Sequence, residues 1–254
     1  MSPGEASWAF DPAHFAETKL GFKPDAKQRT VLESGARRLI LCCSRQWGKS
    51  TVSAVAALHE AIYRPGSQIV VLSRSLRQSG ELVRKVRGFA GKLGLRLKGD
   101  GVNQVSLQFP NGSRVVGTPS TGDTIRGFSA VTLMLVDEAS RVTDELYHAV
   151  RPMLATTDGR LWLMSTPNGK DGFFYREWAY GGDTWLRVEA RATECERLSE
   201  RFLEEEKETL GEKMFGQEYL CRFVQSQDRF FDEDDIRACL REDLEPLRIP
   251  GWTV

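Results

Sequence analysis

The sequence predicts an α/β fold in which a mainly parallel sheet is flanked by helices. The first observation is a β-rich run at residues 39–43 that leads through a polar loop into a helix-compatible run at 51–59. The second is a pair of apolar runs, at 131–136 and 160–164, of the kind found in strands buried on both faces. The third is that polar groups follow each of these strands, which predicts a site at the carboxyl edge of the sheet.

Length and composition exclude several classes of protein. With 254 residues, the chain is long enough for one large domain, or for one domain and a small appendage. The net charge is zero, so any surface that binds nucleic acid must be local. Five cysteines without a CxxC pair fit a reducing compartment better than a disulfide scaffold or a zinc site. We expect neither a membrane span nor a signal peptide, since no apolar run approaches 18 residues.

The loop after the first strand has the features of a phosphate-binding loop. Gly48, Lys49 and Ser50 open the helix that follows. Backbone N–H groups at such a helix start favour negative charge, and Gly48 lets the backbone approach a phosphate closely. Lys49 is expected to reach the β- and γ-phosphates, and Ser50 to place its hydroxyl on Mg²⁺.

One position departs from the G-x-x-x-x-G-K-[ST] pattern, because Cys43 stands where the first glycine belongs. A chance Gly-Lys-Ser at a helix start is therefore the alternative interpretation. Arg45 and Gln46 are a second unusual feature of the loop, since they add a cation and an amide near the expected phosphates.

The strand at 131–136 ends in Asp137 and Glu138, as a Walker B element does. Asp137 is expected to hold Mg²⁺ through water, and Glu138 to orient or deprotonate an attacking water. An acidic pair that caps a strand for structural reasons is the alternative. The strand at 160–164 ends in Ser165 and Thr166, hydroxyls suited to sensing a γ-phosphate.

Two further candidates lie on predicted helices. Gln28 follows the capping residue Asp25 and occupies the position from which a glutamine reads adenine in many nucleotide motors, although an exposed helix glutamine is equally compatible. Residues 74–98 carry eight basic residues and one acidic residue. This stretch is the best nucleic-acid candidate, with a solvated helix face as the alternative. The basic residues chosen on its helix are Arg77, Arg84, Lys85 and Arg87.

The motifs CSRQWGKS, LMLVDEAS and MSTPNG, in this order and spacing, resemble the ATPase domain of the large terminase subunit of tailed double-stranded DNA bacteriophages. That family typically replaces the first loop glycine and carries an Arg-Gln pair before G-K-[ST]. The segment GQEYLCRF, at residues 216–223, resembles the end of that family's ATPase region. The resemblance covers residues 22–231.

The resemblance implies a P-loop NTPase fold with an additional strand between the Walker A and Walker B strands. It also implies Mg²⁺-dependent ATP hydrolysis that drives double-stranded DNA into a capsid. The partners would be DNA, the portal and the small terminase subunit, with a homo-oligomeric ring on the portal and a monomer in isolation. The expected location is the cytoplasm of the infected host, transiently at the portal, without a membrane.

Site residues follow from the resemblance by position. Lys49 and Glu138 would be catalytic, Ser50 and Asp137 would hold the metal, and Ser165 and Thr166 would belong to the coupling motif. Arg45 would respond to nucleotide state. Arg126, in the TIRG segment, resembles the catalytic arginine that ring motors present to a neighbour's ATP; a cis ion pair or a DNA contact are alternatives. The complete ATP-binding set is Gln28, Ser44, Arg45, Gln46, Trp47, Gly48, Lys49, Ser50 and Thr51.

The resemblance also predicts the domain organisation. We expect an ATPase core at residues 1–170 and a small linker or lid subdomain at 171–254. Large terminases carry a nuclease domain after the ATPase region, and no set of nuclease carboxylates is found in 225–254, so no nuclease activity is expected. Another P-loop translocase or helicase remains an alternative that strand separation would reveal. A nucleotide-dependent assembly module is a third possibility, which ATP turnover would exclude.

Overall fold

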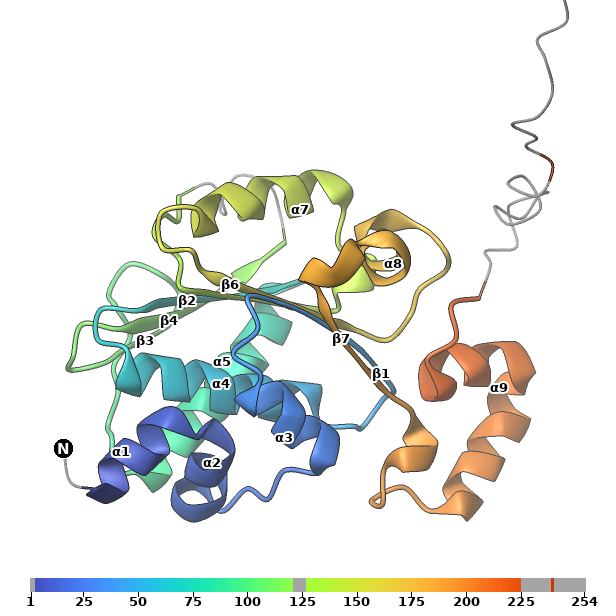
Figure 1. Cartoon of the computed structure of the whole chain (residues 1–254), viewed down its shortest axis with the longest axis horizontal. Coiled ribbons are helices and arrows are strands. Elements are labelled where there is room, and N and C mark those ends of the chain that lie inside the picture. The colour runs from blue at the N-terminus through green and yellow to red at the C-terminus, as the bar shows by residue number, and fades with distance from the viewer. Residues whose placement is uncertain (1–2, 121–126, 225–238, 240–254) are drawn as a thin grey trace, which may run out of the picture. The chain divides into compact units, whose positions relative to one another are not determined.

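A seven-stranded sheet forms the centre of the protein, in the strand order β3-β4-β2-β5-β6-β1-β7. The computed structural model describes residues 3–120, 127–224 and 239 (Figure 1). All neighbouring strands are parallel except β3 and β4, which form an antiparallel hairpin. The strands are β1 (Arg38–Cys43), β2 (Gln68–Ser73), β3 (Val105–Gln108), β4 (Arg114–Pro119), β5 (Leu133–Asp137), β6 (Arg160–Ser165) and β7 (Leu186–Ala190).

Strand β6 lies between β1 and β5 and pairs with both. The strand of the phosphate loop and the strand of the acidic pair are therefore separated by one additional strand, as predicted. Strands β3 and β4 form a hairpin around Asn111 and Gly112, and Gly112 has a φ of 83° that favours glycine. The predicted mainly parallel α/β fold is thus confirmed.

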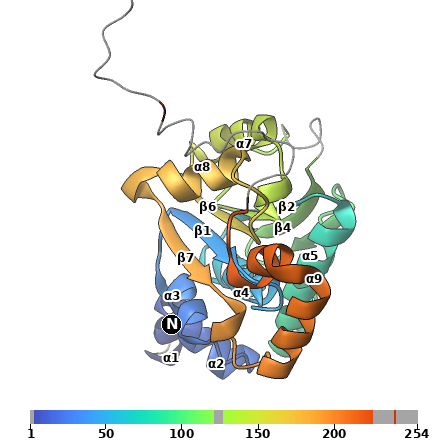
Figure 2. The same ribbon diagram turned by 90° about the vertical axis from the view of Figure 1, so that its right-hand side faces the viewer.

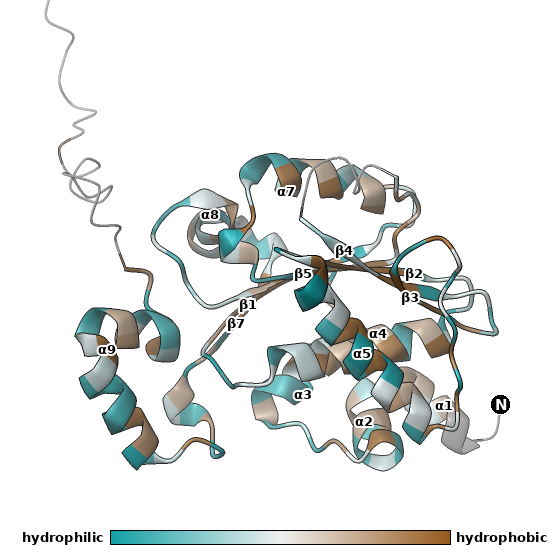
Figure 3. Ribbon diagram, turned by 180° about the vertical axis from the view of Figure 1, so that it is seen from behind, coloured by the Kyte–Doolittle hydropathy of each residue, from teal (hydrophilic) through white to brown (hydrophobic). Residues whose placement is uncertain are grey.

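Helices cover both faces of the sheet because side chains alternate along each strand. In β1, Leu39 and Leu41 join the core beneath one face, whereas Ile40 joins the core on the other. Helices α1 (Pro3–Phe10), α2 (Pro12–Leu20), α3 (Ala26–Glu33), α4 (Lys49–Tyr63) and α5 (Leu76–Lys92) lie on the first side. The second side carries α7 (Asp144–Val150), α8 (Gly172–Tyr180) and the 3₁₀ turns η1 (Ala139–Arg141) and η2 (Arg151–Leu154). Figure 3 shows the strands between these layers as predominantly hydrophobic.

The region after residue 170 contributes to the same sheet. Strand β7 pairs with β1 in parallel, and Phe173 and Phe174 of α8 are buried in the core on the α7 side. Residues after 170 thus complete the sheet beside β1. The functional division at residue 170 stays a prediction.

Helix α9 (Glu200–Leu220) follows the turns η3 (Gly182–Thr184) and η4 (Ala192–Glu194) and stands at the β7 end of the sheet (Figure 2). Gly211 has non-helical angles, φ 72° and ψ 163°, and divides the helix into two parts. Leu203, Phe215 and Tyr219 form a small core of their own with Ala192. Within the described residues, no helix is long and apolar enough to cross a membrane.

Candidate functional site

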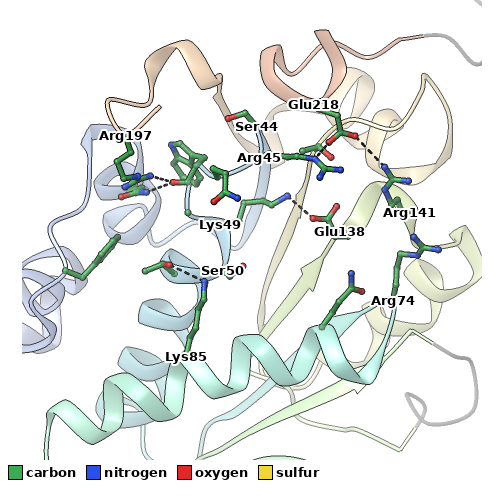
Figure 4. A pocket seen from close by; sticks show the side chains of 18 residues that line it. Ser44, Arg45, Lys49, Ser50, Arg74, Lys85, Glu138, Arg141, Arg197 and Glu218 are labelled. Carbon is green, nitrogen blue, oxygen red and sulfur yellow. Dashed lines mark hydrogen bonds and ion pairs between the residues drawn. The ribbon is translucent and has the colours of Figure 1, made fainter. Parts of the chain in front are cut away.

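The residues predicted to bind phosphate and metal follow the carboxyl ends of three adjacent strands, β1, β6 and β5. Since these strands are parallel, their carboxyl ends meet at one edge of the sheet. A cavity of about 950 Å³ opens at this edge (Figure 4). Its lining includes the predicted residues Gln28, Ser44, Arg45, Gln46, Trp47, Gly48, Lys49, Ser50, Thr51, Lys85, Glu138 and Thr166.

The backbone of the loop between β1 and α4 requires left-handed conformations at two positions. Gln46 has a φ of 63° and Gly48 a φ of 105°. A Cβ at position 48 would lie only 3.0 Å from the Gln28 amide nitrogen, so both backbone angle and space favour glycine there. Cys43, at the position of the missing glycine, is the last residue of β1 and is fully buried, so this position is strand rather than loop.

Lys49 and Glu138 join the phosphate loop to the acidic pair. The Lys49 Nζ lies 3.0 Å from the Glu138 Oε1, with side chains 12% and 26% exposed. Burial acts to lower the pKa of Lys49, but neighbouring acidic groups, among them the carboxylates of Glu138 and Asp137, outweigh burial and raise it. Lys49 is therefore a permanent cation facing the cavity.

Glu138 has a φ of 53° and ψ of 44°, a left-handed conformation that is strained for a residue with a side chain. The Oε2 atom lies 3.4 Å from the Ser165 hydroxyl, which in turn lies 2.7 Å from the Ser140 hydroxyl. Ser165 and Thr166 are buried at the end of β6, and Thr166 lines the cavity. The Glu138 carboxylate thus contacts Lys49 of α4 and Ser165 of β6.

The oxygen atoms at this edge suit Mg²⁺ bound with a polyphosphate. Ser50 lines the cavity, whereas Asp137 is the last residue of β5 and directly precedes the cavity-lining Glu138. Burial raises the pKa of Asp137, and the positive charge of Lys49 opposes that shift. In the described part of the chain, no three His, Cys, Asp or Glu residues cluster for a metal. Mg²⁺ takes only one or two carboxylates beside phosphate oxygens and water, so the donor set fits.

The buried Ser44 supports a phosphate-binding function for the loop. Its hydroxyl makes no hydrogen bond, while its backbone N–H donates to the Ala190 carbonyl. A buried polar atom without a partner is costly, and a ligand oxygen in the cavity would satisfy it.

Gln28 is buried, and its amide already has protein partners. Its Nε2 donates to the Trp47 carbonyl at 2.8 Å, and its Oε1 accepts from the Asp25 N–H at 3.1 Å in a capping box. Gln28 thus fixes the start of α3 and the phosphate loop. Since each amide atom has capacity for a second hydrogen bond, contact with a base stays a prediction.

The four basic residues predicted to bind DNA lie on α5 but differ in their surroundings. Arg84 pairs with Glu81 at 2.6 Å, Arg87 donates to the Leu97 carbonyl at 3.0 Å, and Arg77 is exposed. Lys85 points to the cavity, where its Nζ lies 3.4 Å from the Thr51 hydroxyl (Figure 4). Of the four residues, Lys85 lines the cavity and the three arginines do not. Arg126 lies outside the described residues.

The structure adds four charged residues to the cavity lining that were not chosen from the sequence, namely Arg74, Arg141, Arg197 and Glu218. Arg197 donates to the Trp47 carbonyl at 2.5 Å, and Arg141 and Glu218 line the same cavity. Glu218 lies within the segment GQEYLCRF. The family resemblance identified this segment but assigned no role to Glu218. Arg141 follows the acidic pair by three positions, whereas no pattern in the sequence distinguishes Arg197.

The fold and the site together define an α/β protein with a P-loop-like site at the carboxyl edge of its sheet. The family described as "Terminase large subunit, T4likevirus-type, N-terminal" matches residues 40–238. The chain belongs to this family.

Relatives support this membership. The large terminase subunit of Thermus virus P23-45 is 29% identical over 176 residues, which cover 61% of this chain and 36% of that protein. The chain thus matches about a third of the length of that curated relative.

The structure of the Thermus phage P74-26 large terminase ATPase domain has a TM-score of 0.71 at 23% identity and covers 83% of this chain and 98% of that one. The large terminase of another thermophilic bacteriophage, in complex with ADP, has a TM-score of 0.66 at 14% identity, covering 79% and 54%. Both structures share the fold.

Proposed function

We propose that this chain is the ATP-hydrolysing motor part of a DNA-packaging terminase. The observation that carries the proposal is the Lys49–Glu138 ion pair, which joins the phosphate loop to the acidic pair inside the cavity. Membership of the terminase family and the ADP complex of the thermophilic bacteriophage terminase support the choice of nucleotide.

Each side chain of the site has its own proposed role in hydrolysis. Lys49 binds phosphate oxygens, while Ser50 and Asp137 would hold Mg²⁺, which neutralises phosphate charge when bound. In the structure Glu138 is paired with Lys49. Phosphate would draw the Lys49 ammonium away, because phosphate oxygens compete for the same cation. The Glu138 carboxylate then becomes free to orient a water and accept its proton. Ser165, which ends β6 beside Glu138, and Thr166, which lines the cavity, would report on the phosphate.

The further partners of this motor are double-stranded DNA, a capsid portal, a small terminase subunit and further copies of the chain in a ring. The proposed location is the cytoplasm of the infected cell. Arg77, Arg84 and Arg87 on the exposed side of α5 are the proposed DNA contacts. Binding through such residues is electrostatic, so it should weaken steeply with salt.

The test is ATP turnover by the purified chain. We expect hydrolysis that stops when Mg²⁺ is chelated, and no separation of duplex strands. Lys49→Ala should weaken nucleotide binding at least about tenfold, because charged hydrogen bonds to phosphate are lost. Equilibrium titration with a fluorescent ADP measures this loss, and Lys207→Ala, an exposed lysine of α9, is the matched control. Equal affinity in the Lys49 variant, or no turnover by the unaltered chain, would contradict the proposal.

A second prediction separates Lys85 from the basic residues around it. Lys85→Ala should lower nucleotide affinity about three- to fivefold, the effect expected for one partly exposed ion pair. Arg96→Ala, which removes an exposed cation beyond the end of α5, should leave the affinity unchanged. The same titration is repeated with duplex DNA. If Lys85→Ala affects only DNA binding, the side chain does not serve the nucleotide site.

A further inference from the structure

Glu218 of α9 is a buried carboxylate in the wall of the nucleotide cavity. Its side chain is only 4% exposed. Its Oε2 lies 2.7 Å from the Arg45 Nε, and its Oε1 lies 3.7 Å from the Arg141 Nη2. Figure 4 shows the carboxylate between the two guanidinium groups.

The three residues come from three elements of the site. Arg45 belongs to the phosphate loop, Arg141 ends the turn η1 that follows Glu138, and Glu218 lies in the second part of α9. The backbone reinforces the first of these contacts, since the Arg45 N–H donates to the Glu218 carbonyl at 3.0 Å. One carboxylate thus connects α9 to both halves of the site.

The two arginines differ in their freedom to move. The Arg45 side chain is 61% exposed and lies in the loop expected to surround phosphates. Its contact with Glu218 raises the pKa of its guanidinium, so it is always charged. Arg141 is 33% exposed and lies farther from the carboxylate. A buried carboxylate left without a cation is strongly destabilising. The departure of Arg45 is therefore tolerable only while another cation stays near Glu218.

We propose that Glu218 is a positioning residue that holds Arg45 away from the phosphates until nucleotide binds, and that Arg141 then keeps Glu218 paired. The proposal rests on the proposed nucleotide binding at this cavity. Phosphate oxygens and the Glu218 carboxylate compete for one guanidinium, because both are anions that accept charged hydrogen bonds from it. Occupancy of the cavity thereby loosens the side-chain link between α9 and the phosphate loop.

The prediction is that two substitutions in the same ion-pair group change nucleotide affinity in opposite directions. Glu218→Gln removes the competitor for Arg45, so ADP and a non-hydrolysable ATP analogue should bind about three- to tenfold more tightly. Arg141→Gln leaves Glu218 dependent on Arg45 alone, so both ligands should bind about three- to tenfold more weakly. Glu212→Gln, at an exposed ion pair of the same helix, is the control and should change nothing.

Double variants show whether the effects pass through Arg45. In an Arg45→Ala background, Glu218→Gln should no longer alter affinity, whereas direct repulsion between Glu218 and phosphate would leave the gain intact. Arg141→Gln should likewise lose its effect in that background, whereas a direct Arg141–phosphate contact would preserve it. This second comparison tests the proposal even if Glu218→Gln fails to fold, which circular dichroism would show.

The outcomes separate this inference from the proposed function. If the unaltered chain binds neither ligand, the proposed function fails. If the unaltered chain binds both ligands but the two single variants shift affinity in the same direction, or if either effect survives Arg45→Ala, the positioning role of Glu218 is overturned.

Discussion

Glu138→Gln is expected to slow ATP hydrolysis by about 10²- to 10⁴-fold while nucleotide still binds. Glutamine has the size of glutamate and offers an oxygen to Lys49 and to Ser165, the two groups that contact the carboxylate now. Unlike the glutamate carboxylate, however, the glutamine amide does not accept a proton from water at neutral pH. The substitution therefore removes the chemistry and keeps the shape of the site.

Two measurements separate these effects. The first is the steady-state hydrolysis rate at saturating ATP, and the second is the dissociation constant for ADP. The control is Glu145→Gln, an exposed glutamate at the start of α7, which should match the unaltered chain in both. Normal turnover by Glu138→Gln would rule out Glu138 as the proton acceptor or water-positioning group. If the variant lost both ADP binding and hydrolysis, the substitution would instead have disrupted the structure of the site.

The second large effect is expected for Arg126. An arginine that stabilises the transferring phosphoryl group contributes roughly 10³- to 10⁵-fold to the rate, so Arg126→Ala should bind ATP and turn it over very slowly. Arg126 lies in the segment between the carboxyl end of β4 and the start of β5. Because β4 is parallel to β2, and β2 to β5, the carboxyl end of β4 lies at the sheet edge that carries the site. If a neighbouring copy supplies the arginine, activity per molecule should rise with protein concentration.

Mixing two inactive variants tests whether Arg126 acts between subunits. Glu138→Gln retains Arg126, and Arg126→Ala retains Glu138. In a mixture, the first variant can supply its arginine to the intact carboxylate of the second, so activity should reappear. If the mixture remains inactive and activity per molecule is independent of concentration, Arg126 acts within its own chain or on DNA.

Patterns that lie within a few residues were readable from the sequence. The run from β1 through Gly48 into α4, the acidic pair after β5 and the hydroxyls after β6 are local signals. They depend on alternating or continuous burial and on residues that follow a strand end directly. The parallel arrangement of these strands was predictable as well, because continuous apolar runs such as 131–136 suit strands that are buried on both faces. An additional strand between the strands of the phosphate loop and the acidic pair followed from the family resemblance, and the structure shows that this strand is β6.

Contacts between distant residues were decided only by the tertiary structure. Glu218 meets Arg45 across 173 positions, and Arg197 meets Trp47 across 150. No periodicity links such pairs, since the packing of α9 and the turn of the chain after β7 bring them together. The direction in which Lys85 points, and the pairing of β7 with β1, also depend on neighbours that a one-dimensional pattern does not contain. From the sequence alone we could identify the groups proposed to carry out hydrolysis, because those groups lie directly after strand ends. The fold decided which charges surround them, because charges interact through space and not along the chain.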